Sequence, residues 1–171
     1  VYSAEKNYMH LDFTQRAMHR MHDIQVRLDD NLEMLEAIES FYDASNVVER
    51  VEFEAFTKRL LSKYPDIQSI DWVARVPHEQ REAFEQKIRG EGLAGFQVTE
   101  MDLSGQLVRA KDRPEYFPLT YLEPLSVNKA VLGFDEASDP VRRKALEQAR
   151  DTDGPVVTER LDSIQTEEKS A

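Results

Sequence analysis

The sequence contains no cysteine, and only six glycines and seven prolines are spread over its 171 residues. The absence of cysteine excludes a disulfide framework and metal sites built on thiolates, although it does not decide the redox compartment. Apolar runs are only a few residues long, which is too short for a helix that crosses a bilayer. No signal peptide opens the chain, and a start at Val1 in place of Met favours a fragment of a longer protein.

Positive charge is also scarce, with 22 basic against 33 acidic residues and a net charge of −11. Lysine and arginine form no cluster of the kind that attracts phosphate backbones or anionic lipids. We therefore expect no nucleic-acid partner. We expect attachment to a membrane only through transmembrane helices that this chain does not contain.

Residues 2–44 contain neither glycine nor proline and consist of good helix formers, which predicts one helix about 60 Å long. Its apolar residues are spaced by 4, 3, 4, 4, 3 and 3 positions, close to a heptad repeat, at Ala17, Met21, Ile24, Leu28, Leu32, Leu35 and Ile38. A compact domain of this size is only about 30 Å across, so part of the helix should project as a stalk. We expect a homodimer formed through this stalk.

The rest of the chain alternates between helical and extended patterns. Helices are predicted at 51–62, 78–92 and 139–150, and strands at 67–76, 96–103, 116–125, 130–135 and 155–164. The turn signal SVNK, with Asn128, predicts a hairpin between the third and fourth strands. The expected fold class is α+β: a stalk helix in residues 1–50, then a domain in 51–171 whose mostly antiparallel sheet of about five strands is flanked by helices.

Asp135 ends the apolar segment AVLGFD and is not explained by capping of the next predicted helix. That helix has its own N-cap signal, Asp139 followed by Pro140. The pattern therefore leaves a carboxylate at the end of a strand. Taken alone, Asp135 is more often a solvated or backbone-bonded turn residue.

Four segments, spanning Tyr64 to about Thr158, resemble the CHASE domain, the extracytoplasmic sensor module of histidine kinases, nucleotide cyclases, cyclic-diguanylate enzymes and plant cytokinin receptors. They are YPDIQSIDWVARV, HEQREAFEQKIRGEG with Arg81 and Phe84, RPEYFPLTYLEPLSVNKAVLGFD, and TDGPVVTERL. The resemblance implies a periplasmic or extracellular part of an inner-membrane protein. It implies a long N-terminal helix and two stacked PAS-like halves, of which the membrane-distal one holds the ligand. Residues 51–171 would be that distal half.

The resemblance also implies a ligand site, because cytokinin-binding members have an aspartate at the position of Asp135 and a backbone contact near Val157. A carboxylate facing a small apolar pocket accepts N–H bonds from a flat heterocycle and repels anions. We therefore expect a neutral or cationic ligand with N–H donors. The residues before Asp135 depart from the plant pattern, so cytokinin itself does not follow. The predicted ligand-binding residues are Asp135, Val157, Thr158, Tyr121 and Phe134.

Other interpretations are weaker. Aromatic residues at a spacing of two, Tyr121 and Phe134 among them, are more often plain core. His10, His19 and His22 lack a third well-placed ligand, so we expect no metal and no cofactor. No catalytic motif occurs, and an ion pair of Arg113 with Glu123 is preferred to a hydrolase that uses Asp135 and Glu123. The main alternative is a coiled-coil dimerisation and protein-interaction module without a small-molecule ligand.

Overall fold

The structure is a computed structural model, and it describes residues 2–45 and 47–161. The chain divides into two compact units, residues 1–47 and 48–171. The first unit is the helix α1, Tyr2–Asp43. Its 42 residues correspond to about 63 Å at 1.5 Å per residue. The predicted long helix is therefore confirmed.

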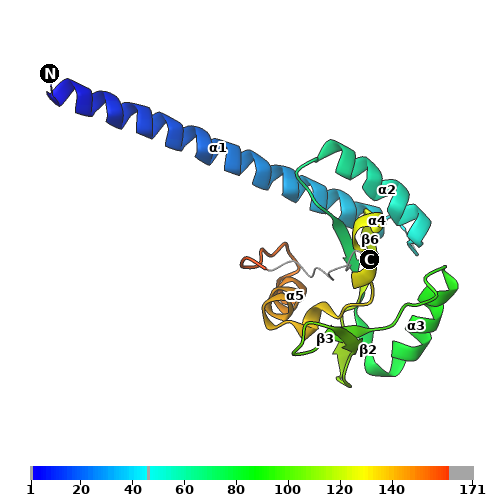
Figure 1. Ribbon diagram of the computed structural model, residues 1–171. Coiled ribbons are helices and arrows are strands. Elements are labelled where there is room, and N and C mark those ends of the chain that lie inside the picture. The colour runs from blue at the N-terminus through cyan, green and yellow to red at the C-terminus, as the bar shows by residue number, and fades with distance from the viewer. Residues whose placement is uncertain (1, 46, 162–171) are drawn as a thin grey trace, which may run out of the picture. The chain divides into compact units, whose positions relative to one another are not determined.

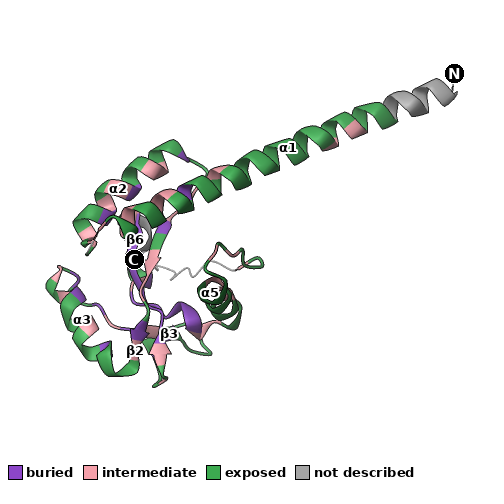
Figure 2. Cartoon of the chain, turned by 180° about the vertical axis from the view of Figure 1, so that it is seen from behind, coloured by how far each residue is buried: buried purple, intermediate pink, exposed green. Residues whose placement is uncertain are grey.

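Several large apolar side chains of α1 are exposed, as the residues in green along the helix show (Figure 2). They include members of the predicted stripe at Met21, Ile24, Leu28, Leu32 and Leu35. Among the residues that the structure describes, no helix has both the length and the apolar content needed to span a membrane.

The second unit is an α+β domain, as predicted, and its elements are short. Its helices are α2 (Arg50–Lys63), α3 (Arg81–Gly90), α4 (Leu125–Asn128) and α5 (Pro140–Thr152). Three 3-10 helices join them: η1 (His78–Gln80), η2 (Lys129–Val131) and η3 (Glu136–Ser138). The strands are β1 (Ile70–Val73), β2 (Val76–Pro77), β3 (Thr99–Met101), β4 (Leu107–Arg109), β5 (Glu115–Tyr116) and β6 (Leu119–Glu123).

The strands form three two-stranded antiparallel sheets, β1 with β6, β2 with β5 and β3 with β4, in place of the single five-stranded sheet that the sequence predicted. Each of these sheets is short. The register of β1 against β6 shifts at a β-bulge or irregularity between Trp72 and Val73. The helices α3 and α5 lie on either side of the strands (Figure 1). Buried residues gather around β2, β3 and β6 (Figure 2).

The predicted hairpin across SVNK is wrong, because that segment is helical: α4 is Leu125–Asn128 and η2 follows it directly. Residues 133–136 nevertheless run between two neighbours. The Thr99 N–H donates to the Gly133 carbonyl at 2.8 Å, and the Leu119 N–H donates to the Phe134 carbonyl at 2.9 Å. Pairing is limited to isolated bridges, Thr99 with Phe134 and Pro118 with Asp135.

Gly133 makes this close approach possible. Its φ is +87°, and a Cβ at this position would overlap the carbonyl oxygen of Gln97. A residue with a side chain would have to push apart the backbones of residues 97 and 133, because the obstacle is main chain and not a flexible side chain. The glycine thereby fixes the entry into η3, whose N-cap Asp135 follows two residues later.

The last predicted strand, 155–164, is also wrong within the structure described: residues 155–161 form no strand, and 162–164 lie outside the described residues. A strand needs a partner that supplies its N–H and C=O groups, and these seven residues pair with no other strand. They form an irregular segment. Residues 153–161 form the C-terminal segment.

A buried ion pair fixes α3 to the strands. Arg81 Nε lies 3.2 Å from Glu85 Oε1, and both side chains are almost fully buried. The Arg81 guanidinium also donates to the carbonyls of Ala110 at 2.9 Å and Val98 at 3.0 Å. The Val98 N–H donates to Glu85 at 3.0 Å. The two side chains therefore satisfy backbone groups of Val98 and Ala110, next to β3 and β4.

Candidate functional site

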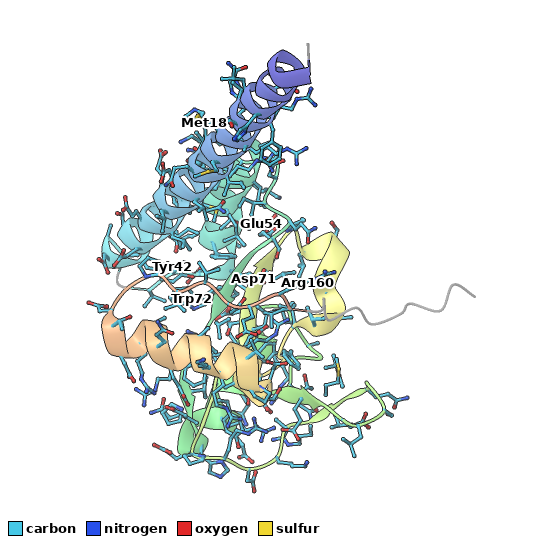
Figure 3. The ribbon with its side chains drawn as sticks, turned by 90° about the vertical axis from the view of Figure 1, so that its left-hand side faces the viewer. Met18, Tyr42, Glu54, Asp71, Trp72 and Arg160 are labelled. Carbon is cyan, nitrogen blue, oxygen red and sulfur yellow. The ribbon has the colours of Figure 1, made fainter. Side chains whose placement is uncertain are left out.

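A cavity of about 280 Å³ lies within the second unit, and we call it the α5 cavity. Its walls come from β1, η3, α5 and the C-terminal segment. Figure 3 labels Asp71 on β1 and Arg160 on the C-terminal segment. The lining residues are Asp71, Val73, Glu136, Arg142, Ala145, Leu146, Ala149, Val156, Thr158 and Leu161.

Local structure explains which residues face this cavity. Successive side chains of a strand alternate between faces, so Asp71 and Val73 of β1 share one face. The four residues of α5 fall at positions i, i+3, i+4 and i+7, which is one face of a helix: Arg142, Ala145, Leu146 and Ala149.

The start of α5 is fixed as the sequence predicted. Asp139 is the N-cap, and its Oδ1 accepts the N–H groups of Val141 at 2.8 Å and Arg142 at 3.0 Å. Pro140 occupies the first turn. This cap sets the rotation of α5 and so determines that Arg142 faces the cavity.

Glu136 and Arg142 form an ion pair at the cavity wall, with Arg142 Nη1 donating to Glu136 Oε2 at 2.6 Å. Burial raises the pKa of the Glu136 carboxyl, the Arg142 guanidinium opposes this, and the charge of Asp71 raises the pKa further. The two carboxyl groups therefore repel each other across the cavity.

Asp71 is the more accessible of the two carboxyl groups. The residue is exposed to solvent and also lines the cavity. Partial desolvation raises the pKa of Asp71, and a hydrogen bond with Ser69 and the charge of Arg142 offset part of the shift.

The predicted site residues are divided by the structure. Thr158 lines the α5 cavity, whereas Val157 is 86% exposed and does not line it. The residues on either side of Val157 line the cavity, so the segment presents alternate side chains to it, as an extended chain does.

Asp135 lies outside the lining of this cavity and has no exposed surface. Its Oδ1 accepts the Phe117 N–H at 2.7 Å and the Ala137 N–H at 3.3 Å, and its Oδ2 accepts from Arg113 Nη1 at 2.8 Å. Asp135 is the N-cap of η3, so the expectation that capping plays no part is wrong: it caps a 3-10 helix that the sequence pattern did not reveal. Burial raises the pKa of this carboxyl, while the Phe117 N–H and Arg113 oppose that shift.

Tyr121 and Phe134 are both buried in the core. The Tyr121 ring packs against Phe53 with the ring centroids 5.6 Å apart, and its hydroxyl donates to Glu91 at 2.9 Å. Tyr121 lines a gap of only about 10 Å³. A ligand role for Asp135, Val157, Tyr121 and Phe134 stays a prediction, and the structure gathers none of them around the α5 cavity.

The expected ion pair of Arg113 with Glu123 is also replaced. Arg113 pairs with Glu100 and with Asp135, from β3 and from the start of η3. Glu123 is buried, and its carboxylate accepts the Leu125 N–H at 3.4 Å. Arg113 therefore joins β3 to residue 135, and Glu123 stabilises the start of α4.

Sequence reasoning missed the charged residues of the cavity: Asp71, Glu136 and Arg142. One signal was present, since Asp71 is a charged residue within the apolar strand pattern of IDWV. Glu136 directly follows Asp135, the residue that the sequence indicated as a ligand contact. Arg142 carries no signal, because arginines are common on exposed helix faces.

A second cavity, of about 330 Å³, is lined by residues 92–96 together with Lys129, Ala130 and Leu132. Half of its lining is glycine and alanine, the rest is Leu93, Phe96, Leu132 and Lys129, and Lys129 is its one charged residue. The α5 cavity brings polar groups together on an apolar wall, which is the usual composition of a ligand site. Within the described part of the chain, no three His, Asp or Glu residues lie where they could share a metal ion.

Comparisons with known proteins agree with the resemblance seen in the sequence. The model of the CHASE domain family matches residues 46–171. A germination-specific adenylate cyclase of Dictyostelium discoideum is 24% identical over 150 residues, which are 86% of this chain and 17% of the cyclase. The chain thus spans a small part of the curated relative that it matches. Because the family match covers well over half of the sequence, this chain belongs to the CHASE domain family of sensor domains in signalling proteins.

Proposed function

We propose that residues 48–171 bind a small organic ligand in the α5 cavity and report its presence to the rest of a membrane-bound signalling receptor. The ligand is neutral or cationic and carries N–H donors. The domain is the distal, PAS-like half of an extracytoplasmic sensor, periplasmic in a bacterial cell. It has no catalytic role of its own.

One observation carries this proposal: two carboxyl groups and an apolar wall meet in one cavity of about 280 Å³. Asp71 and Glu136 supply acceptors for N–H groups, while Val73, Leu146 and Val156 offer apolar surface to the body of a ligand. A ligand that carries a carboxylate would meet like charge and lose hydration without compensation.

The family supports the signalling context, since CHASE domains are sensor domains of signalling proteins. The relative described above is an adenylate cyclase, and this chain matches 17% of it. We propose that the complete receptor carries an enzymatic output domain, such as a histidine kinase, a nucleotide cyclase or a cyclic-diguanylate enzyme. We propose that α1 relays the signal to it.

The test is a thermal-shift screen of the 171-residue chain with small amines, amides and nitrogen heterocycles, followed by calorimetry of the compounds that raise the melting temperature. The site is then checked with Ala149→Phe, which fills the cavity. The control is Gln148→Phe, an exposed neighbour outside the lining. We expect binding to be lost in the first variant and kept in the second. Equal binding by both variants would show that the ligand does not bind in this cavity.

A second function is favoured by one observation, the exposed apolar residues of α1. We propose that a second copy of this helix covers them in a parallel coiled coil, because their spacing is close to a heptad. In this alternative the chain is a dimerisation and interaction module, and the α5 cavity stays empty. Dimerisation is also compatible with ligand sensing.

A further inference from the structure

We propose that the α5 cavity selects an organic cation with a single positive charge, an ammonium or an amidinium, and that Asp71 is the residue that holds it. This inference rests on the proposed function, because it names the ligand class of the same cavity. It goes further by excluding neutral ligands as the preferred class.

Charge balance in the cavity is the first argument. The lining contains two carboxyl groups, Asp71 and Glu136, and one guanidinium, Arg142. With all three ionised, the cavity carries one uncompensated negative charge. A ligand with one positive charge restores neutrality, whereas a neutral ligand leaves that charge in a partly dehydrated site.

The second argument is that the two carboxylates are not equivalent. Glu136 is engaged by Arg142 at 2.6 Å, and its side chain is mostly buried. Asp71 forms no ion pair with any lysine, arginine or histidine of the described residues, and part of its side chain remains accessible. A ligand cation can therefore reach Asp71 without breaking an existing ion pair.

Each wall of the cavity contributes polar or charged groups near Asp71. Ser69 lies on its own segment, Arg142 comes from α5 and Glu136 from η3, and the C-terminal segment contributes Thr158. Desolvation raises the pKa of Asp71, which means that its charge is under-compensated in the ligand-free protein. A bound cation supplies the missing compensation.

The remaining wall argues for an organic cation over a metal ion. Ca²⁺ and Mg²⁺ need about six oxygen ligands or retained waters, and the described residues place no three acidic or histidine side chains together. Three of the other lining residues, Ala145, Leu146 and Ala149, form an apolar face of α5. This face suits the hydrocarbon part of a ligand whose charged end reaches Asp71.

The experiment compares four probes of similar shape by calorimetry with the 171-residue chain: benzylamine and benzamidine as cations, benzyl alcohol as the neutral analogue and benzoate as the anion. We expect both cations to bind and the other two to bind at least tenfold more weakly, since charge-assisted hydrogen bonds are the stronger ones. Asp71→Asn should lower the affinity for both cations by roughly tenfold or more and leave the affinity for benzyl alcohol unchanged.

The control variant is Glu147→Gln, which removes a carboxylate from an exposed position of α5 outside the cavity lining. We expect it to bind the cations as the wild type does. Titrations of the wild type in two buffers of different ionisation enthalpy add a readout that needs no variant. At a pH where Asp71 is partly protonated, a cation that lowers its pKa must release protons as it binds.

The outcomes separate this inference from the proposed function. Equal affinity for benzylamine and benzyl alcohol, with both lost in Ala149→Phe, would overturn cation selection and keep the cavity as a ligand site. Cation binding that Asp71→Asn leaves unchanged would overturn the role of Asp71. If neither the probes nor the screened compounds bind, both proposals fail.

Discussion

Asp135 and Glu136 are adjacent in the chain, yet their carboxylates pair with arginines from different segments. Asp135 Oδ2 lies 2.8 Å from Arg113 Nη1, which precedes β5, and Glu136 Oε2 lies 2.6 Å from Arg142 Nη1 on α5. The first carboxylate is enclosed by protein donors, and the second stands at a cavity wall. Adjacent acidic residues at the start of η3 therefore have different roles.

We expect Asp135→Asn to lower the free energy of unfolding by about 2 kcal/mol, because Arg113 loses a charged partner and a buried oxygen is replaced by an N–H donor. Affinity for a ligand in the α5 cavity should change less than twofold. Denaturant unfolding and calorimetry on the same variant test both statements. Unchanged stability beside a tenfold or larger loss of affinity would assign Asp135 to ligand contact, as the family resemblance implied.

We expect Asp71→Asn to raise the melting temperature of the ligand-free protein at pH 7. The pKa of Asp71 is raised on folding, so its contribution to stability is present below its usual value of about 3.9 and is lost as the pH rises through the raised value. The difference from the wild type should therefore vanish toward pH 3. Thermal melts between pH 3 and 8 measure it, with Glu147→Gln as the control. A lower melting temperature at pH 7 would show that the Asp71 charge stabilises the fold.

The pair of Arg81 and Glu85 is expected to be essential for stability. Arg81→Met should cost about 3 to 5 kcal/mol, because it leaves the Glu85 carboxylate buried without its main partner. The double variant Arg81→Met with Glu85→Leu should recover part of that loss. Glu54→Gln, which removes a more exposed ion pair with Lys58, should have a much smaller effect. Additive losses in the double variant would contradict the coupling.

Acid unfolding should depend on the same glutamate. Burial alone would raise the pKa of Glu85, but the Val98 N–H and the guanidinium groups of Arg81 and Arg109 lower it overall. Its stabilising contribution is therefore present above the usual pKa of about 4.3 and is lost as the pH falls through the lowered folded value. Glu85→Gln should be less stable than the wild type at pH 7 and nearly equal to it at pH 2. A constant difference over this range would rule out the proposed linkage.

Gly133→Ala should destabilise the domain by about 2 kcal/mol or more, because it adds a clash with the Gln97 backbone to the cost of a positive φ. Gly105 is a matched control: its φ is +80°, and a Cβ there would meet nothing within 4 Å. Gly105→Ala should therefore show the conformational cost alone. Equal losses in urea unfolding would mean that the backbone near residue 97 adapts without strain.

The dimer proposal predicts that light scattering detects dimers at high concentration. Leu28→Glu with Leu35→Glu should weaken them, because charges placed in a helix seam lose hydration. His19→Glu with Val26→Glu is the control, since a heptad register places these two residues on the opposite face of α1. A strict monomer at about millimolar concentration, or equal effects of the two pairs, would end the stalk-dimer proposal.

The sequence by itself determined the features that depend on neighbouring residues. The absence of glycine and proline specifies α1, and the pair of Asp139 and Pro140 specifies the start of α5. Helix formation and capping act within a few residues, so their signals can be read locally. Family membership could also be predicted, because the order of four short segments is a property of the chain.

Tertiary structure decided the strand pairs and the site. Whether residues 155–161 pair as a strand depends on a partner edge elsewhere in the chain, and SVNK became helical against its turn signal. The choice between Asp135 and Glu136 depends on what surrounds each carboxylate after folding. Phe117 and Arg113 lie 18 and 22 residues from Asp135 in the sequence, and Asp71 lies far from Glu136. Only packing brings these groups together, so the residue that meets a ligand could not be identified from local pattern alone.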